Sequence, residues 1–244
     1  MDRIDEKDPR SRSYSIADLA EPSSHTVPRS YTWRCNLWLD QGFEGSCVGF
    51  AWAHELAARP VEVLGLSAKF ARESVYFAAQ RHDRFRGGAY PGAAPFAEGT
   101  SVLAGAKAVA SLGYIDEYRW AFDIQDLIVA VGYRGPAVFG CRWYRDMQKP
   151  TIDGVATPTG SRIGKHCVLL NSVKIVRADD GTLDERASFF VFRNSFGKDW
   201  GVQGNGILSL ESVRALWDDA ETCIPVVRQK RPRRSVRKPA DEGS

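Results

Sequence analysis

The sequence predicts an α+β protein of two lobes, with helices in the first half of the chain and antiparallel strands in the second. Apolar residues recur at helical spacing between residues 47 and 113, which is typical of helices packed on a core. After residue 136, short runs rich in β-branched and aromatic residues alternate with Gly, Asp and Asn turns. Helices followed by strands favour two packed units, and the cleft between two lobes is a preferred place for a ligand.

Three helices are expected in the first lobe. The first begins at Cys47, with Ser46 as its N-cap, and stops before Pro60. The others are expected over residues 67–83 and 101–113, and Gly113 would end the last of them. Strands are expected in four later runs, which read AVFGCRW, HCVLLNSVKIV, SFFVFRNSF and GNGILSLESV.

Composition divides the chain into four segments. Residues 1–30 form a polar arm that would lie along the surface or be partly disordered. Residues 31–135 would form the helical lobe and residues 136–227 the β-rich lobe. Residues 228–244 are strongly basic and contain almost no apolar side chains, so a disordered tail is expected there.

Charge and cysteine content exclude several classes of protein. With 244 residues, 43% of them hydrophobic, the chain can bury a sizeable core, and its net charge of +3 does not indicate a whole-surface polyanion binder. The charged N-terminus has no apolar stretch, so we expect no secretion signal and no membrane span. Five scattered cysteines lack the spacing of a zinc site or of a disulfide scaffold, which favours a reducing, cytoplasmic location without metal or other cofactor.

Cys47 is the candidate nucleophile. It follows a glycine-rich loop at the first turn of a helix, where a partly exposed thiol would be activated by the helix dipole and a nearby imidazolium. Among the four histidines, His25 lies in the arm, His54 lies on the same helix as Cys47, and His82 lies in a charged loop. His166 instead opens a strand, and Asn194 at the end of another strand could orient its ring.

Three blocks around these residues resemble the papain-like cysteine peptidases of family C1. The blocks read DQGFEGSCVGFA around Cys47, GKHCV around His166 and NSFGKDWG from Asn194, in the family's order and at comparable spacing. The resemblance covers residues 31–217 and implies a helical lobe and a barrel-like antiparallel lobe with the active site between them.

The resemblance also implies a role for each matching residue. Cys47 would attack the scissile carbonyl, His166 would exchange the proton, and Asn194 would hold the imidazole. Gln41 would donate its amide to the oxyanion together with the Cys47 N–H, a type of contact that contributes about 10²–10³ in rate. Trp200 would shield the hydrogen bond between His166 and Asn194 from water.

Several residues depart from the family pattern. Glu44 stands where secreted members have a disulfide cysteine, so that bridge cannot form. Val48 and Phe196 replace tryptophans, which changes the shape of the site rather than its chemistry. Lys165 would disfavour an imidazolium on His166 unless it points to solvent, and acidic substrate side chains are one candidate partner for it.

Substrate-binding residues are expected on both sides of the nucleophile. Gly45 and Ser46 precede it, and Lys165 and Trp200 flank the His and Asn blocks. The family's glycine-rich substrate segment could correspond to residues 98–101, which include Gly99 and Thr100, or to residues 87–88; we favour the former because it abuts a helix.

The favoured function is a cysteine endopeptidase acting on a protein or peptide substrate. Two alternatives stay open: a related amide hydrolase or acyltransferase, for example one directed at peptidoglycan, and a non-catalytic peptide-binding module. We expect the arm to be too short for the inhibitory prodomain of secreted family members, so narrow specificity, an inhibitor, a covered cleft or an assembly partner would restrain activity. The basic tail could bind nucleic acid, but a solvated tail is favoured because aromatic residues are not interleaved with its charges.

Overall fold

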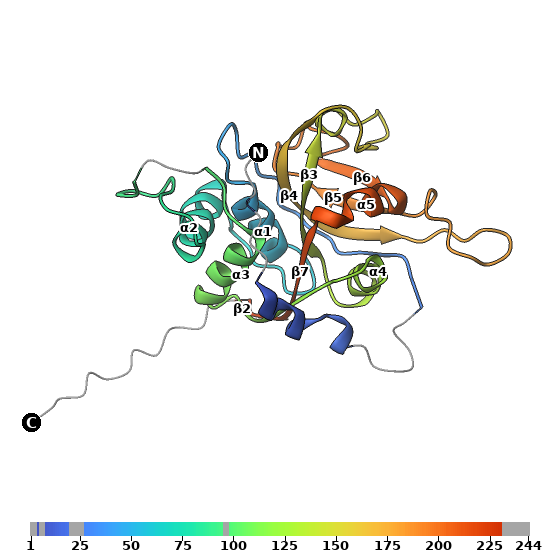
Figure 1. Ribbon diagram of the computed structural model, residues 1–244, viewed down its shortest axis with the longest axis horizontal. Coiled ribbons are helices and arrows are strands. Elements are labelled where there is room, and N and C mark those ends of the chain that lie inside the picture. The colour runs from blue at the N-terminus through green and yellow to red at the C-terminus, as the bar shows by residue number, and fades with distance from the viewer. Residues whose placement is uncertain (1–3, 5–7, 20–26, 95–97, 231–244) are drawn as a thin grey trace, which may run out of the picture.

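Two lobes lie side by side, one built mainly from helices and the other around a sheet (Figure 1). This computed structural model describes residues 4, 8–19, 27–94 and 98–230. The helical lobe contains α1 (Cys47–Ala57), η3 (Phe70–Tyr76), α2 (Phe77–His82) and α3 (Val102–Ser111). The predicted α+β class and two-lobed architecture are therefore confirmed.

In the described part of the chain, seven antiparallel strands form the sheet. They are β1 (Tyr31–Thr32), β2 (Ile115–Trp120), β3 (Ala137–Tyr144), β4 (Arg162–Lys174), β5 (Phe189–Arg193), β6 (Asn205–Ser209) and β7 (Glu221–Arg228). Their order is β2-β7-β3-β4-β5-β6, and β1 pairs with β4. Two further helices, α4 (Ile124–Tyr133) and α5 (Leu210–Leu216), lie on the sheet lobe (Figure 1).

The predicted helices differ from the observed ones mainly at their ends. Helix α1 begins at Cys47 as expected, but Ser46 makes no capping bond, because its backbone (φ −98°, ψ 13°) is not in the extended conformation that aims a cap side chain at the helix. Ser101 does cap α3, accepting the N–H of Ala104 at 3.0 Å. The middle helix follows directly on Ser67, as expected, and Ser67 Oγ accepts the N–H of Phe70 at 3.2 Å; the stretch Phe70–Tyr76, η3, is a π-helix.

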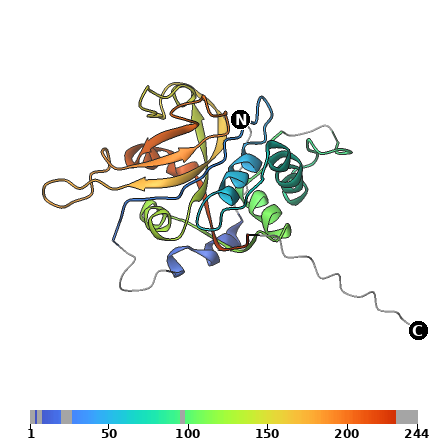
Figure 2. The same ribbon diagram turned by 180° about the vertical axis from the view of Figure 1, so that it is seen from behind.

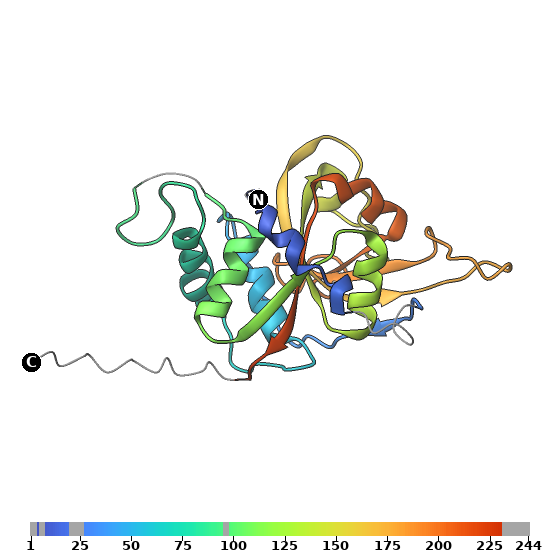
Figure 3. The same cartoon turned by 60° about the horizontal axis from the view of Figure 1, so that its bottom comes forward.

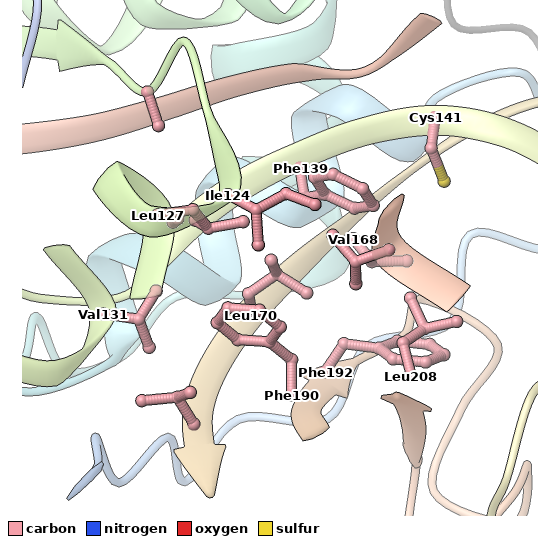
Figure 4. Close-up of a cluster of buried hydrophobic side chains, with 14 of the residues drawn as sticks. Ile124, Leu127, Val131, Phe139, Cys141, Val168, Leu170, Phe190, Phe192 and Leu208 are labelled. Carbon is pink, nitrogen blue, oxygen red and sulfur yellow. The ribbon is translucent and has the colours of Figure 1, made fainter. Parts of the chain in front are cut away.

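Each lobe has its own buried cluster. In the sheet lobe, α4 packs its apolar face on β1, β3 and β4, and Figure 4 shows side chains of this cluster, which include Leu127, Phe139, Leu170 and Phe192. The second cluster lies between α1, α3 and the opposite face of β4, and it contains Cys47 and Leu169. Successive β4 side chains point to opposite faces, so this one strand contributes to both clusters.

The N-terminal arm packs on the sheet where its described part can be followed. Ile16 is buried and donates its N–H to Trp120 O at 2.8 Å, and Ser15 forms a parallel bridge with the same residue. Figure 3 shows η1 (Pro9–Tyr14) lying over β2 and β7. A second short helix, η2 (Ala17–Leu19), follows it, while residues 20–26, also part of the expected arm, lie outside the described residues.

The segment leading to α1 crosses the sheet lobe before it enters the helical lobe, as the view from behind shows (Figure 2). Trp33 fixes this crossing by donating its N–H to Asn171 O at 2.8 Å and its indole N–H to Val131 O at 2.7 Å. The crossing brings the loop before Cys47 to the junction of the lobes. Within the described parts of the chain, no helix is long and apolar enough to span a membrane.

The C-terminal end of the sheet extends one residue into the segment expected to be a tail. Arg228 is the last residue of β7, and its guanidinium is buried against Glu55 of α1. Residues 231–244, which make up most of the expected basic tail, lie outside the described residues. The proposed division of the chain at residues 30, 135 and 227 remains a prediction.

Candidate active site

Cys47 is the first residue of α1, and this helix packs against β4. The N–H groups of a helix's first turn have no partner inside the helix, and the dipole there favours a negative charge. A thiolate on Cys47 would gain from both effects.

The sequence led us to expect a partly exposed thiol at Cys47, but the thiol is buried. Cys47 has no exposed surface, because it lies in the cluster that also holds Val48, Trp52 and the β4 residues Cys167 and Leu169. Periodicity indicates which face of a helix is buried but cannot reveal what covers the helix end. Any molecule that reacts with this sulfur would therefore have to displace the groups that cover Cys47.

His166 and Asn194 are joined by a hydrogen bond, and both are buried. His166 Nε2 lies 2.8 Å from Asn194 Oδ1, and that oxygen also accepts the N–H of Ser195 at 2.8 Å. An amide oxygen can only accept, so His166 must carry its proton on Nε2. The other ring nitrogen, Nδ1, is then the atom that can take up a proton during a reaction.

Aromatic rings enclose the imidazole of His166. Phe196 stacks on it with a centroid distance of 4.9 Å and an interplanar angle of 21°, and Trp143 meets it edge-on at 4.7 Å. Trp200, expected to shield the bond between His166 and Asn194, packs on Phe196 at 5.8 Å and donates its indole N–H to Gln148 O. Phe196 therefore provides the direct cover, and Trp200 supports it from behind.

Gln41 is linked to the same network through Ser195. Ser195 Oγ donates to Gln41 Oε1 at 2.5 Å, and Gln41 Nε2 donates to Glu44 O at 2.6 Å. The Gln41 N–H also bonds Ser195 O at 2.9 Å, so the loop before Cys47 is tied to the segment after Asn194. This chain of bonds connects the expected oxyanion donor to the His166–Asn194 pair across the two lobes.

Glu44, at the position expected to lack a disulfide, forms an ion pair instead. Its Oε2 lies 2.7 Å from Arg72 Nε of η3, and both side chains are partly exposed. None of the five cysteines forms a disulfide. Among the described residues, no group of three or more His, Cys, Asp or Glu side chains is arranged to hold a metal ion.

The other predicted site residues take different positions. Gly45 and Ser46 are buried beside Cys47, and Lys165 is half-buried on β4, opposite Arg142 of β3. Gly99 and Thr100 are buried before α3, and their segment lies beside Tyr76 of η3, which accepts the Gly99 N–H.

The other described histidines lie outside the network. His82 is exposed, and His54 lies on α1 with both ring nitrogens buried and without a hydrogen-bond partner in the described structure. Burial and, to a smaller extent, the charge of Arg193 together lower the pKa of His54 to about 3. His25 lies outside the described residues.

Buried His54 makes stability depend on pH. The unfolded chain takes up this proton below about pH 6.5, whereas the folded chain resists it down to about pH 3, so stability should fall by on the order of 4 kcal/mol as pH drops through that window. We expect His54→Leu to flatten this slope in urea unfolding, since leucine cannot be protonated. His82→Leu is the control on an exposed histidine, and equal slopes for wild type and His54→Leu would refute the assignment.

Trp143 and Ser195 belong to the site although no role was predicted for either. Trp143 is two residues from Cys141, which pairs with His166 in the sheet, so it could have been found by aligning β3 with β4. Ser195 follows Asn194 directly, but only the fold shows that its hydroxyl reaches Gln41.

Solved structures share this fold. Xylellain, a cysteine protease from Xylella fastidiosa, matches with a TM-score of 0.63 at 18% identity, over 92% of this chain and 96% of its own. Procathepsin L 3 from the Tenebrio molitor larval midgut matches at 0.59 and 14%, over 85% and 72%. The cysteine protease and lectin-like domains of Cwp84 from Clostridium difficile match at 0.58 and 14%, over 92% and 61%.

These neighbours define the class of fold. The chain has the two-lobed fold of the papain-like cysteine proteases, as the sequence blocks predicted. No family model and no curated protein matches the sequence.

Proposed function

We propose that this chain is a papain-like cysteine endopeptidase. The observation that carries the proposal is the bond between His166 Nε2 and Asn194 Oδ1, on a strand that packs against the helix begun by Cys47. It fixes the tautomer that leaves Nδ1 to exchange a proton. The shared fold supports a cysteine peptidase, and the three residues stand in the matching blocks.

The reaction follows from these groups. Cys47 Sγ forms a bond to the scissile carbonyl carbon while its proton passes to His166, and Gln41 Nε2 stabilises the oxyanion. The C–N bond then breaks, and the amine leaves with the proton from His166. Water, deprotonated by His166, attacks the thioester and releases the acid together with the Cys47 thiol.

A peptide-binding module on the same fold is the second candidate. The observation that favours it is the complete burial of both Cys47 and His166, which leaves the reacting atoms without exposed surface. Such a module would bind peptide without turning it over. Peptide or protein is the proposed partner in both cases, and an inhibitor or assembly partner could keep the site covered.

A digest separates these functions. Under reducing conditions, the wild-type protein is incubated with a mixed peptide library, once with and once without a primary amine. The products are then identified by mass spectrometry. We expect new peptide termini with water as the acceptor. Amine-capped products would indicate a transferase. Cleavage of peptidoglycan fragments alone would indicate an amidase, and peptide binding without products would indicate the non-catalytic module.

Ser195 provides a prediction on the oxyanion donor. Ser195→Ala removes the bond that orients Gln41, so kcat should fall about tenfold with KM nearly unchanged, because the lost contact acts in the transition state. Ser195→Thr keeps the hydroxyl and should retain most of the activity. Steady-state kinetics on a peptide found in the digest measures both, and an unchanged kcat in Ser195→Ala would exclude this role.

We also propose a reducing, cytoplasmic location. The five cysteines, none of which forms a disulfide, support it, since an oxidising compartment would expose such a chain to disulfide formation.

A further inference from the structure

Three polar side chains, spaced four residues apart, follow one side of the continuous helix formed by η3 and α2. They are Arg72, Tyr76 and Gln80, which we call the η3–α2 stripe. Residues four apart on a helix are neighbours, and the bond from Gln80 Nε2 to Tyr76 Oη at 2.9 Å shows that two of them touch. The proposed mechanism assigns no role to any of the three.

The first member of the stripe holds the loop that carries the oxyanion donor. Arg72 Nε donates to Glu44 Oε2 at 2.7 Å, and the main-chain oxygen of Glu44 accepts the amide of Gln41 at 2.6 Å. Arg72 is thus linked to Gln41 through a single intermediate residue, Glu44. The pair is partly exposed, so its own contribution to stability is small.

The other two members hold the segment before α3. Tyr76 Oη accepts the N–H of Gly99 at 3.0 Å, and Gln80 Nε2 donates to Gly99 O at 3.0 Å. Gly99 has a φ of +97°, which glycine adopts without strain, and because glycine is free to adopt many other conformations, contacts from outside can select this one. Both main-chain groups of this residue are therefore fixed by side chains of one helix.

Thr100, the next residue, can receive another segment of backbone. Its hydroxyl is held by Asp83, the residue after α2, at 2.7 Å, and its main-chain oxygen accepts the N–H of Ile4 at 2.9 Å. An extended peptide could donate to the same oxygen. This edge can receive a substrate only if Gly99 keeps its conformation.

The stripe is also fixed relative to the nucleophile. Helices α1 and η3 approach so closely at Gly49 that a Cβ there would lie 2.5 Å from Ala71 O and 2.7 Å from Tyr76 Cβ. Burial raises the pKa of Tyr76 to about 12, and the hydrogen bond from the Gly99 N–H opposes this shift. Tyr76 therefore lies against α1 at Gly49 and is bonded to the segment before α3 at Gly99.

We propose that the η3–α2 stripe positions both sides of the active site, with Arg72 setting the Gln41 loop and with Tyr76 and Gln80 setting the edge at Gly99 and Thr100 that binds the substrate backbone. This inference rests on the proposed peptidase function. The three side chains are positioning residues, because each acts through another group. They hold the site by ion pair and hydrogen bond, without a disulfide.

Inactivation by the peptide-like epoxide E-64 tests the Gly99 edge. Tyr76→Phe removes only the hydroxyl, and Gln80→Met replaces the amide at similar volume. We expect each variant to raise KI about five- to tenfold, the effect of losing one or two hydrogen bonds, with kinact within about twofold. Amide exchange of residues 98–101 should quicken in both variants.

The Arg72 side is tested with a p-nitrophenyl ester of a blocked amino acid. Arg72→Gln and Glu44→Gln should each lower the acylation rate about threefold while leaving KI for E-64 unchanged, and the double variant should lose no more than either single one, since the two residues form one pair. Glu73→Gln is the matched control, because Glu73 lies on the same helix and pairs only loosely, at 3.9 Å, with Lys69.

The inference is overturned if Tyr76→Phe and Gln80→Met keep both the wild-type KI and the wild-type exchange of residues 98–101. It is equally overturned if Glu73→Gln changes KI as much as they do. Failure of E-64 to label the wild type would instead count against the proposed peptidase function. Amide exchange would then still report whether the stripe holds Gly99.

Discussion

Replacing Cys47 with alanine should lower kcat for peptide hydrolysis by about 10⁵-fold or more, because no other group can form the acyl-thioester. His166→Ala should cost a similar factor, since the thiol then loses its proton acceptor and the amine its donor. The double variant should be no slower than either single one, because the two residues act as one unit. Single-turnover cleavage of a peptide from the digest, followed by mass spectrometry, measures all three.

Cys223→Ala is the control for this loss. Cys223 lies in the same buried cluster as Cys47, and burial raises its pKa well above the ordinary value, so it is expected to stay a neutral thiol. Its replacement by alanine should leave kcat near that of the wild type. If hydrolysis survives in Cys47→Ala but is lost in Cys223→Ala, the assignment of Cys47 as the nucleophile is wrong.

The largest expected effect on stability comes from Arg228. Its Nε lies 2.7 Å from Glu55 Oε1, with 6% and 0% of the two side chains exposed, so the ion pair ties α1 to the end of β7. Arg228→Met should lower the free energy of unfolding by about 3–5 kcal/mol, because Glu55 is left buried without its partner. Urea unfolding at pH 7 measures the loss.

The double variant Glu55→Leu, Arg228→Met should recover most of this loss, since it leaves no buried charge. Arg214→Met is the control, because its ion pair with Glu185 is largely exposed and should contribute little. If Arg228→Met unfolds at the same urea concentration as the wild type, the buried pair does not hold the two elements together.

The fold could be predicted because three short blocks of the sequence are typical of it. Cys47, His166 and Asn194 stand in those blocks, and the fold that the blocks imply is the one observed. Helices α1 and α3 were also predicted, because their apolar residues recur at helical spacing and the signals at their ends are local.

What could not be predicted depends on contacts between distant segments. Strand β7 contains Pro225 and adjoins a basic tail, and its place in the sheet becomes evident only from its pairing with β2 and β3. Helix α4, rich in Ile and Val, lies in a stretch for which no helix was predicted, and it buries that face on the sheet. The burial of Cys47 likewise arises from the packing of α1 on β4, and the stacking of Phe196 on His166 brings the segment after β5 onto β4.

Labelling with E-64, read by intact mass under reducing conditions, tests most directly whether Cys47 is a papain-like nucleophile. Wild-type protein, Cys47→Ala and His166→Ala are compared after their folding has been verified by circular dichroism. We predict one adduct on the wild type and none on either variant. A folded wild-type protein that gains no adduct, or a Cys47→Ala variant that still gains one, would contradict the account.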